Sequence, residues 1–139
     1  MTVTETDVAK KFTSIFSNYN LLVPNNIAER GWTDRLIQLP NSVVVACELK
    51  RVFVNLQNYY LLTELRQEQC AWLAKWQRYG GKCFVFVGIV RFGDDLVGFH
   101  CVTQNLWSNW LQANKSKYVA TKILTPLDVV VWFKEYAGA

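Results

Sequence analysis

The chain has 139 residues, of which 51% are hydrophobic and 19% charged, and its formal net charge is +4. This length suits one folded domain with a real core, and the composition excludes an intrinsically disordered chain. No run approaches the ~20 apolar residues of a membrane-spanning helix, and the N-terminus lacks the pattern of a signal peptide. We therefore expect a soluble, cytoplasmic protein with no membrane partner.

The cysteines and the single histidine argue against a zinc site. Cys47, Cys70, Cys83 and Cys101 form no C-x-x-C motif, and His100 is the only histidine. Cysteines inside apolar runs are typical of small core residues in a reducing compartment, so we expect free thiols. The sequence pI of about 8.9 is compatible with a nucleic-acid partner but does not by itself indicate one.

The chain begins with a predicted helix. Thr4 is a good N-cap, and Glu5 and Asp7 place negative charge in the first turn. The apolar residues from Val8 to Tyr19 then recur at helical spacing. The asparagine-rich stretch 18–26 predicts that a loop follows this helix.

Residues 33–50 are predicted to form a β-hairpin with an apolar body and a charged open end. If its turn is centred on Asn41, Asp34 lies directly across from Glu48. Side chains alternate between the two faces of a strand, so both acids then share one face with Lys50. A shift of one residue in this pairing would separate the two acids.

A helix followed by a buried strand is predicted next. Residues 63–79 have helical periodicity, and Gly80–Gly81 supplies the C-terminal stop. The run 83–90 is apolar throughout, as in a strand that is buried on both faces. A strand, a helix and a second strand in this order predict a right-handed crossover between two parallel strands.

The remaining elements complete the predicted architecture. Asp94–Asp95 predicts a turn, residues 96–102 a further strand and residues 106–111 a short helix. Thr125–Pro126 begins a final helix, with proline at its first position. We therefore expect a single α/β domain over residues 1–139, with a mixed β-sheet flanked by helices.

The two acids at the mouth of the hairpin need a positive partner, because like charges that face each other destabilise a sheet. Lys50 is one candidate partner. A divalent cation is the other, since carboxylate oxygens suit Mg²⁺ or Mn²⁺. A purely structural Asp–Lys–Glu cluster near a sheet end is the alternative interpretation.

Two further polar residues extend this set. Gln69 lies on the same helical stripe as Trp72 and Trp76, so its amide must find a partner. It is either a satisfied core glutamine or an amide aimed at the acids or at a phosphate. Glu5 lies on the Val8 face of the first helix, where it either joins the site or simply favours the helix dipole.

These residues, in this order, resemble the core of the PD-(D/E)XK nucleases. The stretch Gly31-Trp32-Thr33-Asp34-Arg35, a hydrophobic strand, a turn and Glu48-Leu49-Lys50 are similar to the family pattern G-x-P-D-R…E-x-K. The stretch Leu65-Arg66-Gln67-Glu68-Gln69, a helix and a Gly-Gly pair before an apolar strand are similar to the VRR-NUC branch. The match covers about Glu5 to Val90, and it implies a restriction-endonuclease-like core.

The resemblance implies a phosphodiester hydrolase that depends on Mg²⁺ or Mn²⁺. Asp34 and Glu48 would bind the metal together with the backbone carbonyl of Leu49. Lys50 would orient or help to deprotonate the attacking water, and Gln69 would support the site. This chemistry needs no histidine, because a metal and a lysine stabilise the charge that develops on phosphoryl oxygens.

Two positions match the family less closely. Glu5 corresponds to the acid that many members carry on their first helix, and it is a further candidate metal ligand. Thr33 departs from the family, in which proline is usual before the aspartate. That proline shapes the backbone and supplies no ligand, so the departure concerns local geometry.

Small stand-alone members of this branch, often encoded by phages, tend to be homodimers that cleave branched DNA such as Holliday junctions. The resemblance implies the same here, in the host cytoplasm if a phage encodes the chain. The basic residues that we rank as DNA contacts are Arg35, Arg66, Arg51, Lys115 and Lys117. The aromatic residues that form either a dimer face or part of the core are Trp107, Trp110, Trp132 and Phe133.

Two other functions stay open at this point. A non-catalytic DNA-binding module that kept the nuclease fold would bind junctions without a metal and release no product. A restriction-type nuclease would cut a defined duplex site, although the chain carries no evident recognition module.

Overall fold

The computed structural model describes residues 2–24, 33–54, 60–62, 67–103 and 123–138. In these residues the helices are α1 (Glu5–Ile15), α2 (Gln67–Arg78) and α4 (Pro126–Ala137). The strands are β1 (Asn20–Leu22), β2 (Arg35–Gln38), β3 (Val44–Val54), β4 (Tyr60–Leu62), β5 (Lys82–Arg91) and β6 (Asp95–Val102).

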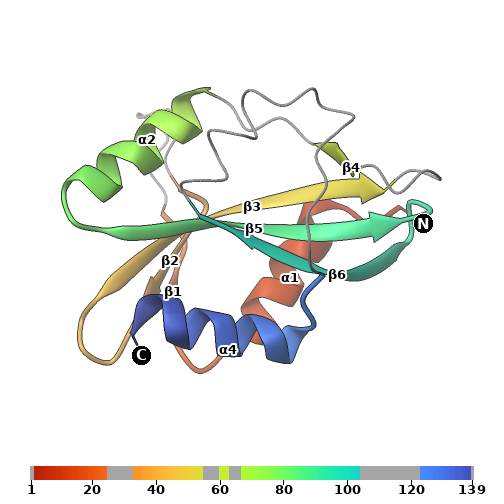
Figure 1. Ribbon diagram of the computed structural model, residues 1–139. Coiled ribbons are helices and arrows are strands. Elements are labelled where there is room, and N and C mark those ends of the chain that lie inside the picture. The colour runs from red at the N-terminus through yellow and green to blue at the C-terminus, as the bar shows by residue number, and fades with distance from the viewer. Residues whose placement is uncertain (1, 25–32, 55–59, 63–66, 104–122, 139) are drawn as a thin grey trace.

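The six described strands form one mixed sheet in the order β1-β2-β3-β5-β6, with β4 also paired to β3. The β3–β5 pair is parallel and the other pairs are antiparallel. Helix α2 covers one face of the sheet, and α1 and α4 lie across the other (Figure 1). This arrangement confirms the predicted α/β class, the mixed sheet and the parallel crossover.

The two faces of the sheet carry different cores. The face beneath α1 and α4 is aromatic, and Phe12, Phe16, Phe84 and Phe133 are fully buried there. The face beneath α2 holds a smaller apolar cluster around Leu73. The buried polar side chains on the α2 side are Glu48, Lys50, Gln69 and His100. The sheet therefore has one apolar face that stabilises it and a second face that carries buried polar side chains.

The helix ends follow the predicted capping chemistry. Thr4 and Thr125 each accept a hydrogen bond from the backbone N–H of an aspartate three residues later, whose side chain accepts one in return. Such reciprocal caps satisfy two donors that the first turn leaves unpaired. In the described residues no helix is long and apolar enough to cross a membrane. All four cysteines are free thiols, as expected.

The structure corrects the prediction of a loop over residues 18–26. Asn20–Leu22 is strand β1, which pairs antiparallel with Leu36–Gln38. Between the predicted hairpin and the predicted helix, β3 continues to Val54 and Tyr60–Leu62 is strand β4, and the sequence predicts neither. Strands of three residues are too short to show a two-residue period in the sequence, and pairing to a longer neighbour forms them. The predicted helix 106–111 lies outside the described residues.

The aromatic residues of α4 belong to the core. Phe133 is fully buried, and Trp132 packs edge-on against Phe84 with 5.1 Å between ring centroids and stacks on Tyr136. Phe133 is therefore not exposed for a dimer contact, which agrees with the interpretation that it forms part of the core. Trp107 and Trp110 lie outside the described residues.

Gly88 allows α1 to approach β5 closely. A Cβ at this position would lie 2.6 Å from Cγ2 of Val8. We expect Gly88→Ala to lower the free energy of unfolding by about 1–3 kcal/mol, measured by urea denaturation. The cost should be smaller when Val8→Ala is also present, because the clashing atom is then gone. Equal costs in both backgrounds would contradict this packing.

Candidate functional site

The hairpin adopts the predicted register. Arg35 pairs with Cys47, and the pairing continues to Gln38 opposite Val44. Extending the same register by one residue places Asp34 opposite Glu48, as a turn centred on Asn41 requires. The predicted register is therefore confirmed for residues 35–38 and 44–47, and Glu48 and Lys50 share one face of β3. Asp34 lies one residue before β2, so its place on that face stays a prediction.

The acids lie at a gap in the edge of the sheet. On this edge of β3, strand β2 pairs as far as Cys47 and β4 pairs from Val52, so neither of these strands is opposite residues 48–51. Asp34 fills part of the gap, because its Oδ2 accepts a hydrogen bond from the Leu49 backbone N–H at 2.9 Å. The N–H and C=O of one strand residue point to the same edge, so the Leu49 carbonyl also faces the gap.

Glu48 is a buried acid with only part of its hydrogen-bonding capacity used. Its side chain is 0% exposed, and Gln69 Nε2 donates to its Oε2 at 2.8 Å. Its Oε1 is buried and has no hydrogen-bond partner within the described part of the chain. Leaving such an atom unpaired costs about 1–3 kcal/mol, or more when it is charged. This oxygen is therefore suited to a ligand.

The surroundings of Glu48 favour its protonated form. Burial and the neighbouring charge of Asp34 raise the pKa of the Glu48 carboxyl from 4.5 to about 9, although the positive charge of Lys50 acts to lower it. Desolvation penalises the charged carboxylate, and a second carboxylate nearby adds repulsion. A divalent cation in place of the proton would relieve both effects.

Lys50 and Gln69 complete the cluster that the sequence predicts. Lys50 lies two residues beyond Glu48 on the same face and is 8% exposed. Gln69 is 6% exposed and reaches Glu48 from α2, which covers this face of the sheet. The amide on the helical stripe is thus aimed at the acids. Asp34, Glu48, Lys50 and Gln69 are brought together from β3, α2 and the segment that precedes β2.

Thr33 holds Asp34 in place in a way that sequence reasoning missed. Its side chain is 2% exposed, and its hydroxyl donates to the Cys47 carbonyl at 2.7 Å. This bond attaches the segment before β2 to β3, one residue from the acid that crosses the gap. The available signal was a hydroxyl residue at a position where the PD-(D/E)XK pattern has proline, whose side chain cannot make this bond.

Glu5 is not brought to the acid pair. It is exposed in the first turn of α1, which packs on the opposite face of the sheet from Glu48. Across the described ranges, no group of three or more histidine, cysteine, aspartate or glutamate residues could hold a metal ion. The ligands available at the gap are therefore two carboxylates, a backbone carbonyl and water.

The candidate DNA-binding arginines differ in their contacts. Arg35 is half-buried and donates from Nη1 to the Asp34 carbonyl at 2.8 Å. Arg51 donates from Nη1 to the Val3 carbonyl at 2.7 Å and lies over the Phe53 ring, 4.7 Å from its centroid. Arg51 thus connects the N-terminal segment to β3. Arg66, Lys115 and Lys117 lie outside the described residues.

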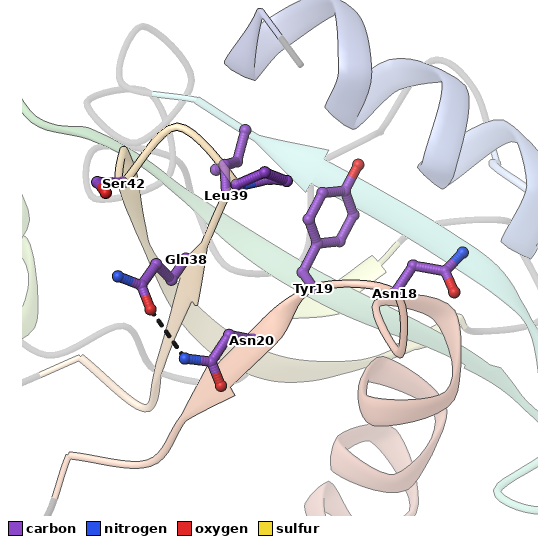
Figure 2. A pocket seen from close by; sticks show the side chains of 7 residues that line it. Asn18, Tyr19, Asn20, Gln38, Leu39 and Ser42 are labelled. Atoms are coloured by element: carbon purple, nitrogen blue, oxygen red, sulfur yellow. Dashed lines mark hydrogen bonds between the residues drawn. The ribbon is translucent and has the colours of Figure 1, made fainter.

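A separate pocket of about 350 Å³ lies at the turn end of the hairpin, away from the acids (Figure 2). Asn20 Nδ2 donates to Gln38 Oε1 at 2.8 Å along its wall. The complete lining is Asn18, Tyr19, Asn20, Gln38, Leu39, Pro40 and Ser42. Its lining includes the hydroxyls of Tyr19 and Ser42 but no carboxylate, lysine, arginine, histidine or cysteine, so the acid pair is the better candidate for chemistry.

Comparison with known protein families and with curated proteins finds no match to this chain. The functional assignment therefore depends on the geometry of the acid pair and on the ordered motif residues.

The raised pKa of Glu48 predicts a pH-dependent stability. Between about pH 4.5 and 9 the folded state keeps a proton that the unfolded chain releases, so stability falls as pH rises through this window. The free energy of unfolding is measured in EDTA by denaturation at several pH values. It should fall less steeply with pH in Glu48→Gln than in wild type, by up to about 1.4 kcal/mol per pH unit. Glu135→Gln, at an exposed position on α4, is the control. Identical pH profiles for wild type and Glu48→Gln would contradict the prediction.

The Thr33 hydroxyl is expected to contribute to stability. Thr33→Val keeps the shape of the side chain but leaves the Cys47 carbonyl without this donor, which should cost about 1–3 kcal/mol in urea denaturation. Thr33→Ser retains the hydroxyl and should lose less. If serine is no better than valine at this position, the hydrogen bond is not the important contact.

Proposed function

We propose that this protein is a Mg²⁺- or Mn²⁺-dependent DNA endonuclease that selects branched structures and has a restriction-endonuclease-like core. The observation that carries the proposal is the acid pair at the gap, where Asp34 and Glu48 meet beside Leu49 with Lys50 and Gln69 on the same face. The order of these residues is the one that the PD-(D/E)XK resemblance implies, in its VRR-NUC branch.

The donors at the gap fit a hard divalent cation. Carboxylate and carbonyl oxygens are the ligands that Mg²⁺ and Mn²⁺ prefer, and Mg²⁺ usually keeps several waters in addition. Asp34 and Glu48 would hold the ion, with the Leu49 carbonyl facing the same edge. A bound ion would supply Lewis-acid chemistry, polarising the phosphate and lowering the pKa of water. The buried Oε1 of Glu48 has no hydrogen-bond partner among the described residues, which favours this interpretation over a structural cluster.

The side chains have separate roles in the proposed reaction. Gln69 fixes Oε2 of Glu48, which leaves Oε1 for the ion. Lys50 orients the attacking water and donates to the phosphoryl oxygens, where negative charge grows in the transition state. The backbone N–H of Leu49 holds Asp34 across the gap. A non-catalytic binder would gain nothing from two carboxylates near phosphates, since they repel DNA.

Branched DNA and a homodimer come from the same resemblance. Two sites in a dimer would nick two strands of a junction symmetrically. The restriction-type alternative predicts cutting of a defined duplex site.

The direct test is cleavage of a four-way junction, a flap and a linear duplex in Mg²⁺, Mn²⁺ or EDTA. We expect metal-dependent cutting of the branched substrates by wild type, and none by Glu48→Gln. Lys50→Ala should be slower by about 10²-fold or more, because it removes a donor to the developing charge. Lys134→Ala, at an exposed position of α4, removes the same charge on the opposite face and should retain full activity.

Circular dichroism establishes that each variant is folded before its activity is compared. Wild type that cuts none of the three substrates in either metal would refute the proposed function. Equal rates for wild type, Glu48→Gln and Lys50→Ala would refute the assigned site.

A further inference from the structure

The pocket at the turn end of the hairpin continues into a second hollow. The first has a volume of about 350 Å³ and the second of about 340 Å³, and Tyr19, Leu39 and Pro40 line both. We call the two hollows together the turn pocket. None of the described residues that line it is charged. A charged ligand would lose its hydration there without gaining a counter-charge, so the turn pocket suits an uncharged ligand.

The Tyr19 ring forms a fixed platform in the wall of the turn pocket. It packs edge-on against Phe133 with 5.2 Å between ring centroids, and it lies 6.4 Å from the ring of Phe16. Both phenylalanines are fully buried, whereas Tyr19 is half-buried and keeps part of its surface for the pocket. A ring that is already held by its neighbours loses little conformational freedom when a flat ligand stacks on it.

Two amide side chains in the same wall are held by each other. Asn20 and Gln38 are directly opposite in the pairing of β1 with β2, and Asn20 Nδ2 donates to Gln38 Oε1 at 2.8 Å (Figure 2). An amide offers one acceptor oxygen and two donor hydrogens, so this bond alone uses only part of what the pair offers. The edges of nucleobases carry neighbouring donors and acceptors, which asparagine and glutamine side chains recognise.

The strand register places these amides on the same face of the sheet as Glu48. Gln38 pairs with Val44, which lies four residues before Glu48 in β3, and residues an even number apart share a face of a strand. A rise of about 3.3 Å per residue separates the two positions by about 13 Å along β3. A DNA strand advances about 3.4 Å per nucleotide, so this distance corresponds to about four nucleotides.

We propose that the turn pocket binds an unpaired base of the nucleic-acid substrate, about four nucleotides from the cleaved phosphate. The base stacks on Tyr19, and the Asn20–Gln38 amide pair binds its edge. A base inside a duplex is already stacked and paired, whereas a base in a single-stranded arm or at a branch point can enter the pocket. The inference rests on the proposed function for its substrate, and it gives a physical reason for the preference for branched DNA over linear duplex.

The test uses a flap DNA in which one abasic site is moved along the single-stranded arm. Its affinity is measured in EDTA by fluorescence anisotropy. Wild type should lose about fivefold to 100-fold in affinity when the missing base is the one that stacks, and little at the other positions. In Mg²⁺ this sensitive position should lie about four nucleotides from the cut.

The matched variants are Tyr19→Leu and Tyr79→Leu. Tyr19→Leu removes the platform and should make the affinity the same at every abasic position. Tyr79→Leu removes the same ring from a position that is 81% exposed and outside the turn pocket, so it should keep the wild-type profile. Gln38→Leu removes an amide without touching the aromatic core and should also flatten the profile. Circular dichroism establishes that each variant is folded.

Titration with adenosine, followed by the backbone amide signals of β1 in NMR spectra, separates a free nucleoside from a base of the nucleic acid. A single base gains most when its strand is already held elsewhere on the protein, so adenosine alone should bind weakly and lose its shifts in Tyr19→Leu. Tight adenosine binding together with a flat abasic profile would overturn the assignment to nucleic acid.

The outcomes distinguish the turn pocket from the nuclease. A flat abasic profile in wild type that cuts DNA would overturn the pocket and leave the proposed function intact, as would a profile that both Tyr19→Leu and Gln38→Leu retain. A Tyr19-dependent profile in a protein that cuts no DNA would uphold the pocket and reject the nuclease. Wild type that binds no DNA would overturn both.

Discussion

The hydrogen bond from the Leu49 backbone N–H to the Asp34 carboxylate is the contact on which the rest of the site depends. It spans a position on the edge of β3 where neither β2 nor β4 pairs, so a side chain takes the place of a strand. This places one carboxylate beside the buried Glu48, at the opening that the Leu49 carbonyl also faces. A shift of one residue in the hairpin would separate the two acids and break this hydrogen bond.

The site is costly to the fold that carries it. A fully buried glutamate beside a second acid stays ionised only if a positive charge lies close, and Lys50 compensates in part. Gln69 satisfies one oxygen of Glu48, while Thr33 attaches the segment before β2 to β3. The aromatic core beneath α1 and α4 supplies the stability that allows the opposite face to keep unfavourable charges.

Much of this geometry was predictable from the sequence, because the two-residue alternation of the hairpin determines which side chains share a face. The same holds for Gln69, whose place on an apolar helical stripe directs it to the sheet. The sequence did not reveal β1 or β4, since pairing with longer strands forms such short elements. Nor could it reveal that Arg51 contacts Val3, because that contact depends on how the segment before α1 approaches the sheet.

The most direct test of the acid pair is Mn²⁺ binding measured by titration calorimetry at pH 7, in two buffers with different ionisation enthalpies. Because the pKa of Glu48 is about 9, the carboxyl is protonated before the metal binds, and binding must release that proton. We expect one tight site with about one proton released, and we expect Asp34→Asn and Glu48→Gln each to abolish binding. Mn²⁺ binding that persists unchanged in both variants, or no binding by wild type, would contradict a metal site at the acid pair.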